Sequence, residues 1–296
     1  MLVLAYNVGP HSLLEYLIPR IYWINISRGT DYAVIEHCLA RCNETKGAIL
    51  HVDATNQECY PADRKELLRY LDSLGCTCWN RRLGDLSKPA IQAWNVRLGL
   101  PTTRAEISGE PTEQVIIKTA ANCRGLAERR LDTTNQLPSS ALGVSTPLFD
   151  RFGDYRVLPR SDVSSAFWRD DHLFIERFVP NSTSFIRVIL FGSQTLLLDF
   201  ESNAQVKRTH NSILKQIILG TRDVVLLKVP SLTSIAHERA CQFADAIGLD
   251  CGAIDLVLSP AEPYIVDVNA IPWWNEAMPF NIRLHLLEHT CPYLLR

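Results

Sequence analysis

Short apolar runs alternate with helical segments over the first part of the chain, and this alternation restricts the fold more than any other feature. The runs occupy residues 2–6, 21–26, 47–52 and 76–80. Runs of this length are typical of buried strands. An amphipathic helix is predicted over 61–75, with Pro61 at its start and Gly75 after its end. The pattern predicts a small α/β lobe over residues 1–86.

A second lobe is expected over residues 87–179. Its helix begins at Ser87 with apolar residues at helical spacing, and a buried strand follows at 115–120. Residues 122–163 are polar and rich in turn formers, with no clear period apart from short candidate strands. A β-rich run at 173–179 closes the lobe.

Residues 180–296 are expected to form a third lobe around an antiparallel sheet. β-rich runs lie at 185–192, 194–202, 251–258 and 264–269. Between them, residues 234–248 have the spacing of an amphipathic helix that ends at Gly248. The predicted fold class is therefore α/β, built from α+β lobes. A content of 47% hydrophobic residues in a chain of 296 is enough to bury a large core.

The last two runs form a predicted hairpin that brings two carboxylates together. A five-residue loop over 259–263 would pair Leu258 with Tyr264. Asp255 then lies directly opposite Asp267. Opposed carboxylates repel each other unless a cation lies between them. The hairpin therefore predicts a cation site.

Asn269 shares the face of Asp267, because side chains alternate along a strand. The other face is predicted to point into the core: Ile254, Leu256, Val266 and Val268. Two carboxylates and an amide oxygen are hard ligands, which suit Mg²⁺, or Mn²⁺ in its place, better than zinc or copper. An ordinary solvent-facing hairpin is the alternative if the register shifts by one residue.

Four cationic side chains precede this hairpin in the sequence. A phosphate that binds together with magnesium would need such cations around it. Lys118 is central in the apolar strand 115–120, where it either reaches the edge of the sheet or meets an anion. Arg187 is likewise a charge among large apolar residues, and its planar fork suits phosphate or carboxylate. Lys88 at a helix start and Arg208 in a polar loop are, taken alone, also typical of solvated surface.

The order of these motifs resembles the ATP-grasp superfamily. SKPAIQAWNVRLGLPTT at 87–103 is similar to the family's lysine-bearing helix, and VIIKTAANCRG at 115–125 to its second lysine and phosphate-covering loop. LFIERFV at 173–179 is similar to the hinge that meets adenine. GAIDLVLSPAEPYIVDVNAIP at 252–272 is similar to the carboxylate pair and asparagine that bind magnesium, with Asp267 where glutamate is commoner.

The resemblance covers about residues 85–280, and it is nearest to the branch with the ribosomal-protein glutamate ligase and amino-acid and peptide ligases. It implies three lobes, with ATP between the central and C-terminal ones. The site residues that it implies are Lys88 and Lys118 for the ATP phosphates, Glu176, Arg177, Phe178 and Val179 for adenine, Asp255, Asp267 and Asn269 for the metal, and Arg187 with Arg208 for the transferred phosphoryl group. Adenine would meet the backbone of the hinge, so the side chain of Glu176 is compatible with an exposed position.

The activity that the resemblance implies is ATP-dependent carboxylate–amine ligation. A carboxylate is activated as an acyl phosphate, and an amine then forms an amide or peptide bond, with release of ADP and phosphate. Small-molecule substrates are expected, amino acids or a peptide among them. The alternatives are an ATP-grasp kinase acting on a small-molecule hydroxyl and a nucleotide-binding protein without turnover. The loop at 122–130 would cover the phosphates, and Trp273 and Trp274 would pack between lobes or line the acceptor pocket.

Charge and cysteine content exclude several other classes. Thirty Lys and Arg against 32 Asp and Glu, scattered along the chain, give no basic face for nucleic acid or anionic lipid. We expect no signal peptide and no membrane span. Nine cysteines at irregular spacing favour reduced thiols and a cytoplasmic location, and buried thiols rather than a zinc site. A homo-oligomer is compatible with the sequence, which does not identify the substrates.

Overall fold

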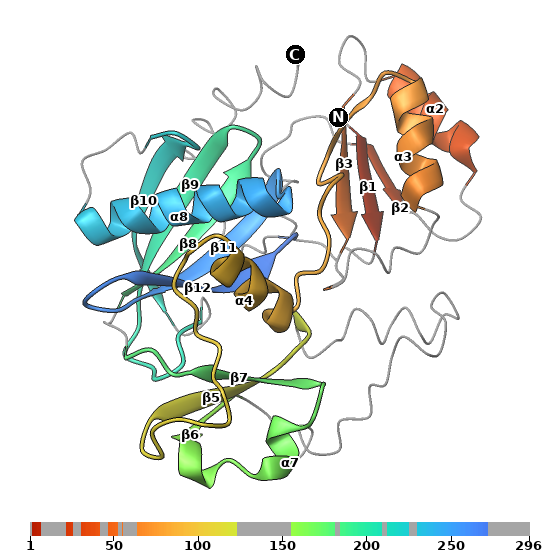
Figure 1. Ribbon diagram of the computed structural model, residues 1–296. Coiled ribbons are helices and arrows are strands. Elements are labelled where there is room, and N and C mark those ends of the chain that lie inside the picture. The colour runs from red at the N-terminus through yellow and green to blue at the C-terminus, as the bar shows by residue number, and fades with distance from the viewer. Residues whose placement is uncertain are drawn as a thin grey trace.

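In the computed structural model, the described part of the chain forms three β-sheets that follow one another along the sequence (Figure 1). It describes residues 2–6, 22–25, 31–41, 47–52, 55, 64–122, 155–180, 184–208, 212–224 and 230–271. Helices flank the first and third sheets, which gives the mixed α/β architecture expected from the sequence. None of the helices in the described ranges is both long enough and apolar enough to cross a membrane.

The first sheet is parallel and four-stranded, in the order β2-β1-β3-β4. Its elements are β1 Leu2–Tyr6, β2 Tyr22–Asn25, α2 Tyr32–Ala40, β3 Gly47–Val52, α3 Arg64–Ser73 and β4 Thr77–Trp79. Each of the four apolar runs of the sequence forms one of these strands. The sequence analysis missed α2, whose first turn is capped by the Asp31 side chain accepting from the Ala33 amide at 2.9 Å. Leucines and isoleucines of both helices pack on the sheet.

The second sheet is antiparallel and three-stranded, in the order β6-β5-β7. Its elements are β5 Gln114–Thr119, β6 Arg156–Pro159, the 3₁₀ helix Arg160–Asp162, α7 Ser165–Trp168 and β7 Leu173–Arg177. A small core joins the sheet to α7 through Val115, Ile117 and Phe167. The predicted strands at 115–120 and 173–179 correspond to β5 and β7.

The third sheet is antiparallel and five-stranded, in the order β10-β9-β8-β11-β12. Its strands are β8 Ser184–Phe191, β9 Gln194–Glu201, β10 Ile213–Thr221, β11 Cys251–Leu258 and β12 Pro263–Asn269. The sequence analysis missed β10, which is an edge strand with exposed residues such as Ile213 and therefore lacks a buried apolar run. Two helices, α4 Lys88–Arg97 and α8 Ser231–Ile247, accompany the sheet.

The main core lies between one face of the five-stranded sheet and these two helices. Phe243 on α8 and Ile91 on α4 join Val188, Ile254 and Leu256 of the sheet in one buried cluster. Gly248 ends α8 in the left-handed conformation, as the sequence indicates. The opposite face of the five-stranded sheet lines the pocket described below.

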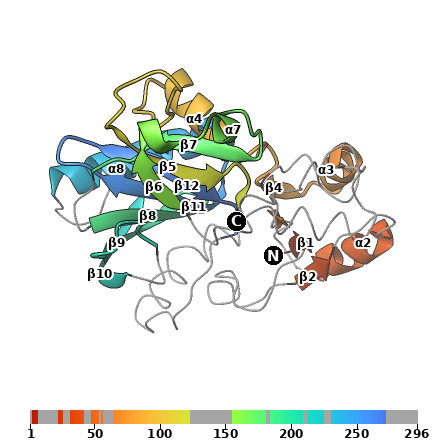
Figure 2. The ribbon, with the colours of Figure 1, turned by 90° about the horizontal axis from the view of Figure 1, so that it is seen from below.

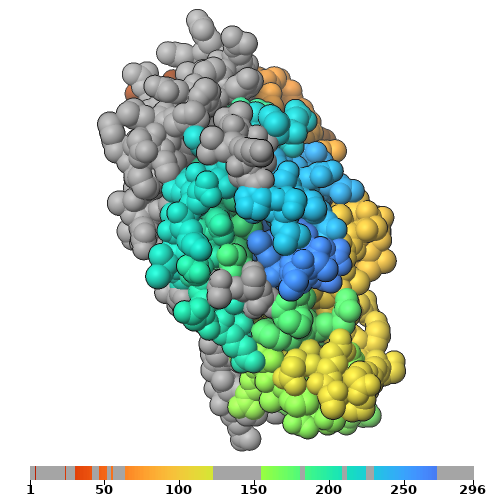
Figure 3. Space-filling view, turned by 90° about the vertical axis from the view of Figure 1, so that its left-hand side faces the viewer, coloured from red at the N-terminus to blue at the C-terminus, as the bar shows by residue number. Residues whose placement is uncertain are grey.

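The three-stranded sheet lies next to β11, β12 and α4 in both ribbon views (Figures 1 and 2). In the space-filling view its residues, yellow to light green, lie directly against those of the five-stranded sheet, cyan to blue (Figure 3). Charged and apolar side chains of both sheets therefore meet at a single pocket.

Asn80 joins the first sheet to the third. Its side-chain oxygen accepts from the backbone amides of Asp250 and Cys251 at 2.9 and 3.0 Å. Its side-chain nitrogen donates to the carbonyl oxygens of Leu50 and Cys251 at 3.3 and 2.8 Å. The residue is fully buried and has a φ of 60°, a conformation that asparagine tolerates better than most residues. The end of β4 is thereby held against the start of β11.

Candidate active site

A pocket of about 320 Å³ lies between the three-stranded sheet and the five-stranded sheet. The eleven site residues that the resemblance implies all line it: Lys88, Lys118, Glu176, Arg177, Phe178, Val179, Arg187, Arg208, Asp255, Asp267 and Asn269. Apolar walls come from side chains of both sheets, including Ile116, Phe185 and Val257. The pocket thus combines an apolar slot with a cluster of charges, an arrangement that suits a nucleotide.

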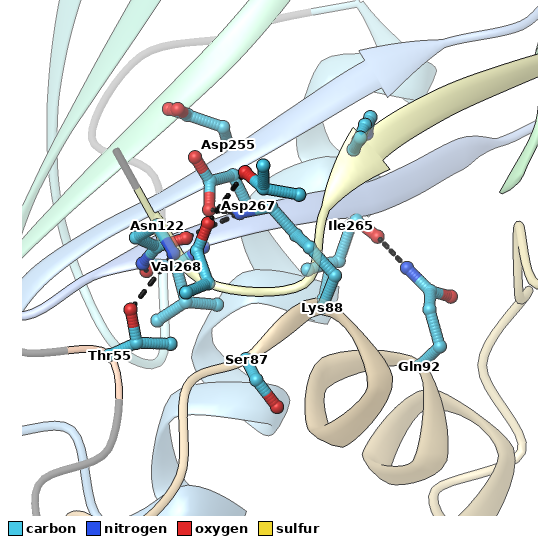
Figure 4. Close-up of polar contacts among 12 residues, drawn as sticks. Thr55, Ser87, Lys88, Gln92, Asn122, Asp255, Ile265, Asp267 and Val268 are labelled. Carbon is cyan, nitrogen blue, oxygen red and sulfur yellow. Dashed lines mark hydrogen bonds and ion pairs between the residues drawn. The ribbon is translucent and has the colours of Figure 1, made fainter. Parts of the chain in front are cut away.

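Lys88 reaches the pocket from the first turn of α4. Ser87 caps this helix, its hydroxyl accepting from the Ala90 amide, and the ammonium of Lys88 lies at the end of a side chain that is only 2% exposed. The ammonium donates to Asp267 and, at 2.5 Å, to Oδ1 of Asn122 (Figure 4). Burial, the largest single effect, lowers the pKa of Lys88, but the charge and hydrogen bond of Asp267 together with the charges of Tyr155 and Glu176 outweigh it, and the pKa is raised. Lys88 is therefore a buried cation rather than solvated surface.

The hairpin of β11 and β12 brings Asp255 and Asp267 opposite each other by a route that differs from the predicted one. Leu258 pairs with Pro263 and not with Tyr264, so the predicted register at the turn is wrong by one residue. A β-bulge between Asp255 and Leu256 then restores the opposition of the two carboxylates. The correct pairing at the site depends on a backbone irregularity that alternation alone does not predict.

The bulge also changes the position of Val266. Ile254, Leu256 and Val268 are buried in the main core, as predicted. Val266, which was assigned to the same face, lines the pocket instead, because the extra residue interrupts the alternation of side chains along β12. It contributes to the apolar wall beside Asp267.

Arg187, Asp255 and Asp267 lie abreast across three neighbouring strands. Arg187 on β8 pairs with Asp255 on β11, which pairs with Asp267 on β12. The guanidinium of Arg187 makes a two-pronged contact with Asp255, from Nε to Oδ1 at 2.6 Å and from Nη2 to Oδ2 at 2.7 Å. Burial, the largest single effect, lowers the pKa of Arg187, but the charge and hydrogen bond of Asp255 together with the charge of Asp267 outweigh it, and the pKa is raised. The opposed carboxylates thus each have a cation beside them.

Lys118 meets an anion, the second of the two alternatives that its strand position left open. It forms an ion pair with Glu176 on the adjacent strand β7, and the two side chains are 10% and 1% exposed. The expectation that the Glu176 side chain is compatible with exposure is wrong, because the glutamate extends inward to this lysine. Thr103 and Gln92 also donate hydrogen bonds to Oε1 of Glu176. A buried charge of this kind is stable only when it is paired and hydrogen-bonded.

Gln92 connects this pair to the strand that carries Asp267. Its side-chain nitrogen donates to Glu176 at 3.0 Å. The same nitrogen donates to the carbonyl oxygen of Ile265 on β12 at 3.1 Å (Figure 4). Its side-chain oxygen accepts from the Thr103 amide at 3.0 Å. Gln92 lies four residues after Lys88, which places both side chains on one face of the helix, and this spacing was the signal in the sequence that could have identified it.

Comparison with known proteins places this arrangement in a known fold. No protein-family model matches the chain, and no curated protein matches it in sequence. Among solved structures, a RimK domain ATP-grasp protein from Sphaerobacter thermophilus covers 100% of both chains with a TM-score of 0.50 and 12% identity. The chain has the ATP-grasp fold.

Two further solved structures are similar to the chain at lower scores. The ATP-grasp ligase PsnB complexed with minimal precursor covers 98% of this chain and 99% of its own, with 12% identity and a TM-score of 0.49. D-alanine–D-alanine ligase from Bacillus anthracis complexed with ATP covers 99% of this chain and 97% of its own, with 12% identity and a TM-score of 0.47.

The donor set of this pocket fits magnesium whose remaining ligands come from water and a phosphate. Asp255 and Asp267 offer carboxylates and Asn269 an amide oxygen, all lining the same pocket. Over the described ranges, no group of three or more His, Cys, Asp or Glu side chains is placed to hold a metal. Magnesium is usually held by one or two carboxylates, with water and substrate phosphate completing the shell, so this set fits Mg²⁺ better than zinc.

Tyr155 lines the pocket although the sequence did not indicate it, and Lys207, in the polar stretch of Arg208, lines it too. The guanidinium of Arg208 lies 4.7 Å from the centre of the Tyr155 ring, and the ammonium of Lys118 lies 6.0 Å from it. Burial lowers the pKa of Lys207. Tyr155 immediately precedes β6, in a stretch without a clear period, so no local pattern marked it.

Some predictions concern residues outside the described ranges. These are the covering loop at 122–130 beyond Asn122, and Trp273 and Trp274 after β12.

Proposed function

We propose that the chain is an ATP-dependent carboxylate–amine ligase that forms an amide or peptide bond through an acyl phosphate. The observation that carries this proposal is the row of Arg187, Asp255 and Asp267 across the sheet, with Lys88 and Lys118 in the same pocket. Phosphoryl transfer needs positioned cations around the phosphates and a metal on their oxygens. The motif order and the ATP-grasp fold agree with this chemistry.

The nucleotide is proposed to bind with its adenine at the hinge that follows β7. Glu176, Arg177, Phe178 and Val179 line the pocket, and their backbone groups would meet the adenine edge. Lys118 and Lys88 would contact the phosphates farther in. Their present carboxylate partners, Glu176 and Asp267, show that both ammonium groups are directed to anionic oxygens inside the pocket.

Asp255, Asp267 and Asn269 would hold Mg²⁺, which would neutralise charge on the β- and γ-phosphates. A substrate carboxylate oxygen attacks the γ-phosphorus, the bond to the bridging oxygen breaks, and ADP leaves. An amine then attacks the carbonyl carbon of the acyl phosphate, loses a proton and displaces phosphate to form the amide. Arg187, assisted by Arg208, would stabilise the negative charge that develops on the transferred group.

The test combines nucleotide binding with product formation. The purified protein is titrated with Mg-AMPPNP, and ADP release from Mg-ATP is measured with pooled carboxylates and amines. ADP release that requires both a carboxylate and an amine supports the ligase, whereas ADP release with a polyol alone would refute it and indicate a kinase. Absence of nucleotide binding would leave only a protein without turnover.

Asp267→Asn is expected to abolish turnover and leave the fold intact. The amide keeps an oxygen for Lys88 but loses the charge that the metal needs. Asp223→Asn, at an exposed turn outside the pocket, is the matched control and should keep wild-type turnover. Near-normal activity of Asp267→Asn would contradict the metal assignment.

A further inference from the structure

Asn122 follows the three-stranded sheet and contacts segments next to the first sheet and within the third. It lies three residues after β5, and its backbone amide donates to the hydroxyl oxygen of Thr55 at 2.8 Å. Its side-chain oxygen accepts from the Lys88 ammonium at 2.5 Å, and its side-chain nitrogen donates to the Val268 carbonyl at 2.9 Å. Figure 4 shows Asn122 between Thr55 on one side and Lys88, Asp267 and Val268 on the other.

The partners of Asn122 fix which way its amide points. An ammonium can only donate a hydrogen bond, so it must face the side-chain oxygen, and a carbonyl can only accept, so it must face the nitrogen. The amide therefore holds the Lys88 ammonium and the backbone of Val268 at once. Val268 is the residue between Asp267 and Asn269, so the contact fixes the strand segment that presents two of the proposed metal ligands.

Thr55 anchors this arrangement from the N-terminal part of the chain. It follows β3 and is only 4% exposed. Its hydroxyl accepts from the Asn122 amide, while its carbonyl oxygen accepts from the Leu86 amide at 2.8 Å. Leu86 directly precedes Ser87, the cap of the helix that carries Lys88. One residue of the first lobe thus holds both the start of α4 and the segment that contacts the Lys88 ammonium.

We propose that Thr55 and Asn122 are positioning residues for Lys88 and the metal-binding strand, through which the N-terminal lobe sets the geometry of the phosphate site. This inference rests on the proposed function for its consequence on nucleotide binding. It extends that function because none of the site residues implied by the resemblance lies in the N-terminal lobe.

An amide suits this position better than a carboxylate. Asp267 neutralises the Lys88 charge and is also a proposed metal ligand, so it must exchange its partner when Mg-ATP binds. Asn122 is uncharged, and it directs the ammonium without reducing the charge that a phosphate would meet. An aspartate at this position would add a negative charge and would place an oxygen against the Val268 carbonyl.

The test compares Thr55→Val, which keeps the shape but removes the hydroxyl, with Thr55→Ser, which keeps the hydroxyl. Asn122→Ala is examined in parallel, since its side chain is only partly buried and its loss is tolerated more easily. Two quantities are measured: the Lys88 side-chain NMR signal without nucleotide, assigned with Lys88→Arg, and the Kd for Mg-AMPPNP. Thermal melts establish that each variant is folded.

Thr55→Val and Asn122→Ala are expected to shift the Lys88 signal and to weaken Mg-AMPPNP binding roughly ten-fold, while Thr55→Ser restores both. An unchanged Lys88 signal in both Thr55→Val and Asn122→Ala overturns the inference, even if the melting temperature falls. Should wild-type protein not bind Mg-AMPPNP while the Lys88 signal still shifts, the proposed function fails and the positioning role stands. If Thr55→Val does not fold, Asn122→Ala decides by the same two measurements.

Discussion

The ion pair of Lys118 and Glu176 should contribute strongly to stability only as a pair, and a double-mutant cycle tests this. Both side chains are nearly inaccessible to water, at 10% and 1% exposure. Replacing one partner leaves the other charge buried without its counter-ion, which typically costs about 3–5 kcal/mol. We therefore expect Lys118→Met to destabilise the protein by about 3 kcal/mol or more. Glu176→Gln should cost somewhat less, because the amide oxygen can still accept from Thr103.

The double variant Lys118→Met/Glu176→Gln removes both charges, so its loss of stability should be smaller than the sum of the single losses. The expected coupling energy is about 2 kcal/mol or more. The assay is urea unfolding followed by tryptophan fluorescence and by far-UV circular dichroism, which must give coincident transitions before free energies are compared.

The matched control is the pair of Lys215 and Glu201, whose nitrogen and oxygen lie 3.3 Å apart with side chains 46% and 41% exposed. The same substitutions there should give a coupling below about 1 kcal/mol, because solvent screens an exposed pair. Equal coupling energies for the two pairs, or a value below about 0.5 kcal/mol for Lys118 and Glu176, would refute the argument from burial.

Two further predictions concern buried polar groups. Gln92→Leu removes the hydrogen bonds that Gln92 makes with the Thr103 amide and the Ile265 carbonyl. The free energy of unfolding in urea should therefore fall by about 3 kcal/mol. Gln216→Leu on the exposed edge strand should cost less than about 0.5 kcal/mol, and a similar loss in both variants would contradict the role of Gln92. Burial lowers the pKa of His51 to about 3, so the unfolded chain takes up a proton below about pH 6.5 that the folded chain does not. Stability should therefore fall by about 2 kcal/mol between pH 7 and pH 5, and His51→Gln should lose that part of the pH dependence.

Much of the fold followed from local patterns. The apolar runs of the N-terminal lobe, the capped helix that carries Lys88 and the strands β8, β9 and β11 occur where apolar spacing and cap residues predict them. The edge strand β10 was not predicted, because its exposed residues form no buried apolar run. The helix α2 was not predicted, because the preceding Asp31 was not recognised as its N-terminal cap.

The sequence by itself determined which residue types line the site. Lys118 and Arg187 are charges inside apolar strands, and Asp255, Asp267 and Asn269 share a face of a hairpin; such placements are costly unless they serve an ionic site. All of these residues line one pocket.

Only the tertiary structure decided how these charges are paired and held. The opposition of Asp255 and Asp267 depends on a bulge that compensates a turn one residue shorter than predicted. Glu176 extends inward because Lys118 lies on the neighbouring strand. Thr55 and Asn122 are 67 positions apart and became site residues only when the lobes packed together. Such contacts depend on the packing of distant segments, which local periodicity does not encode.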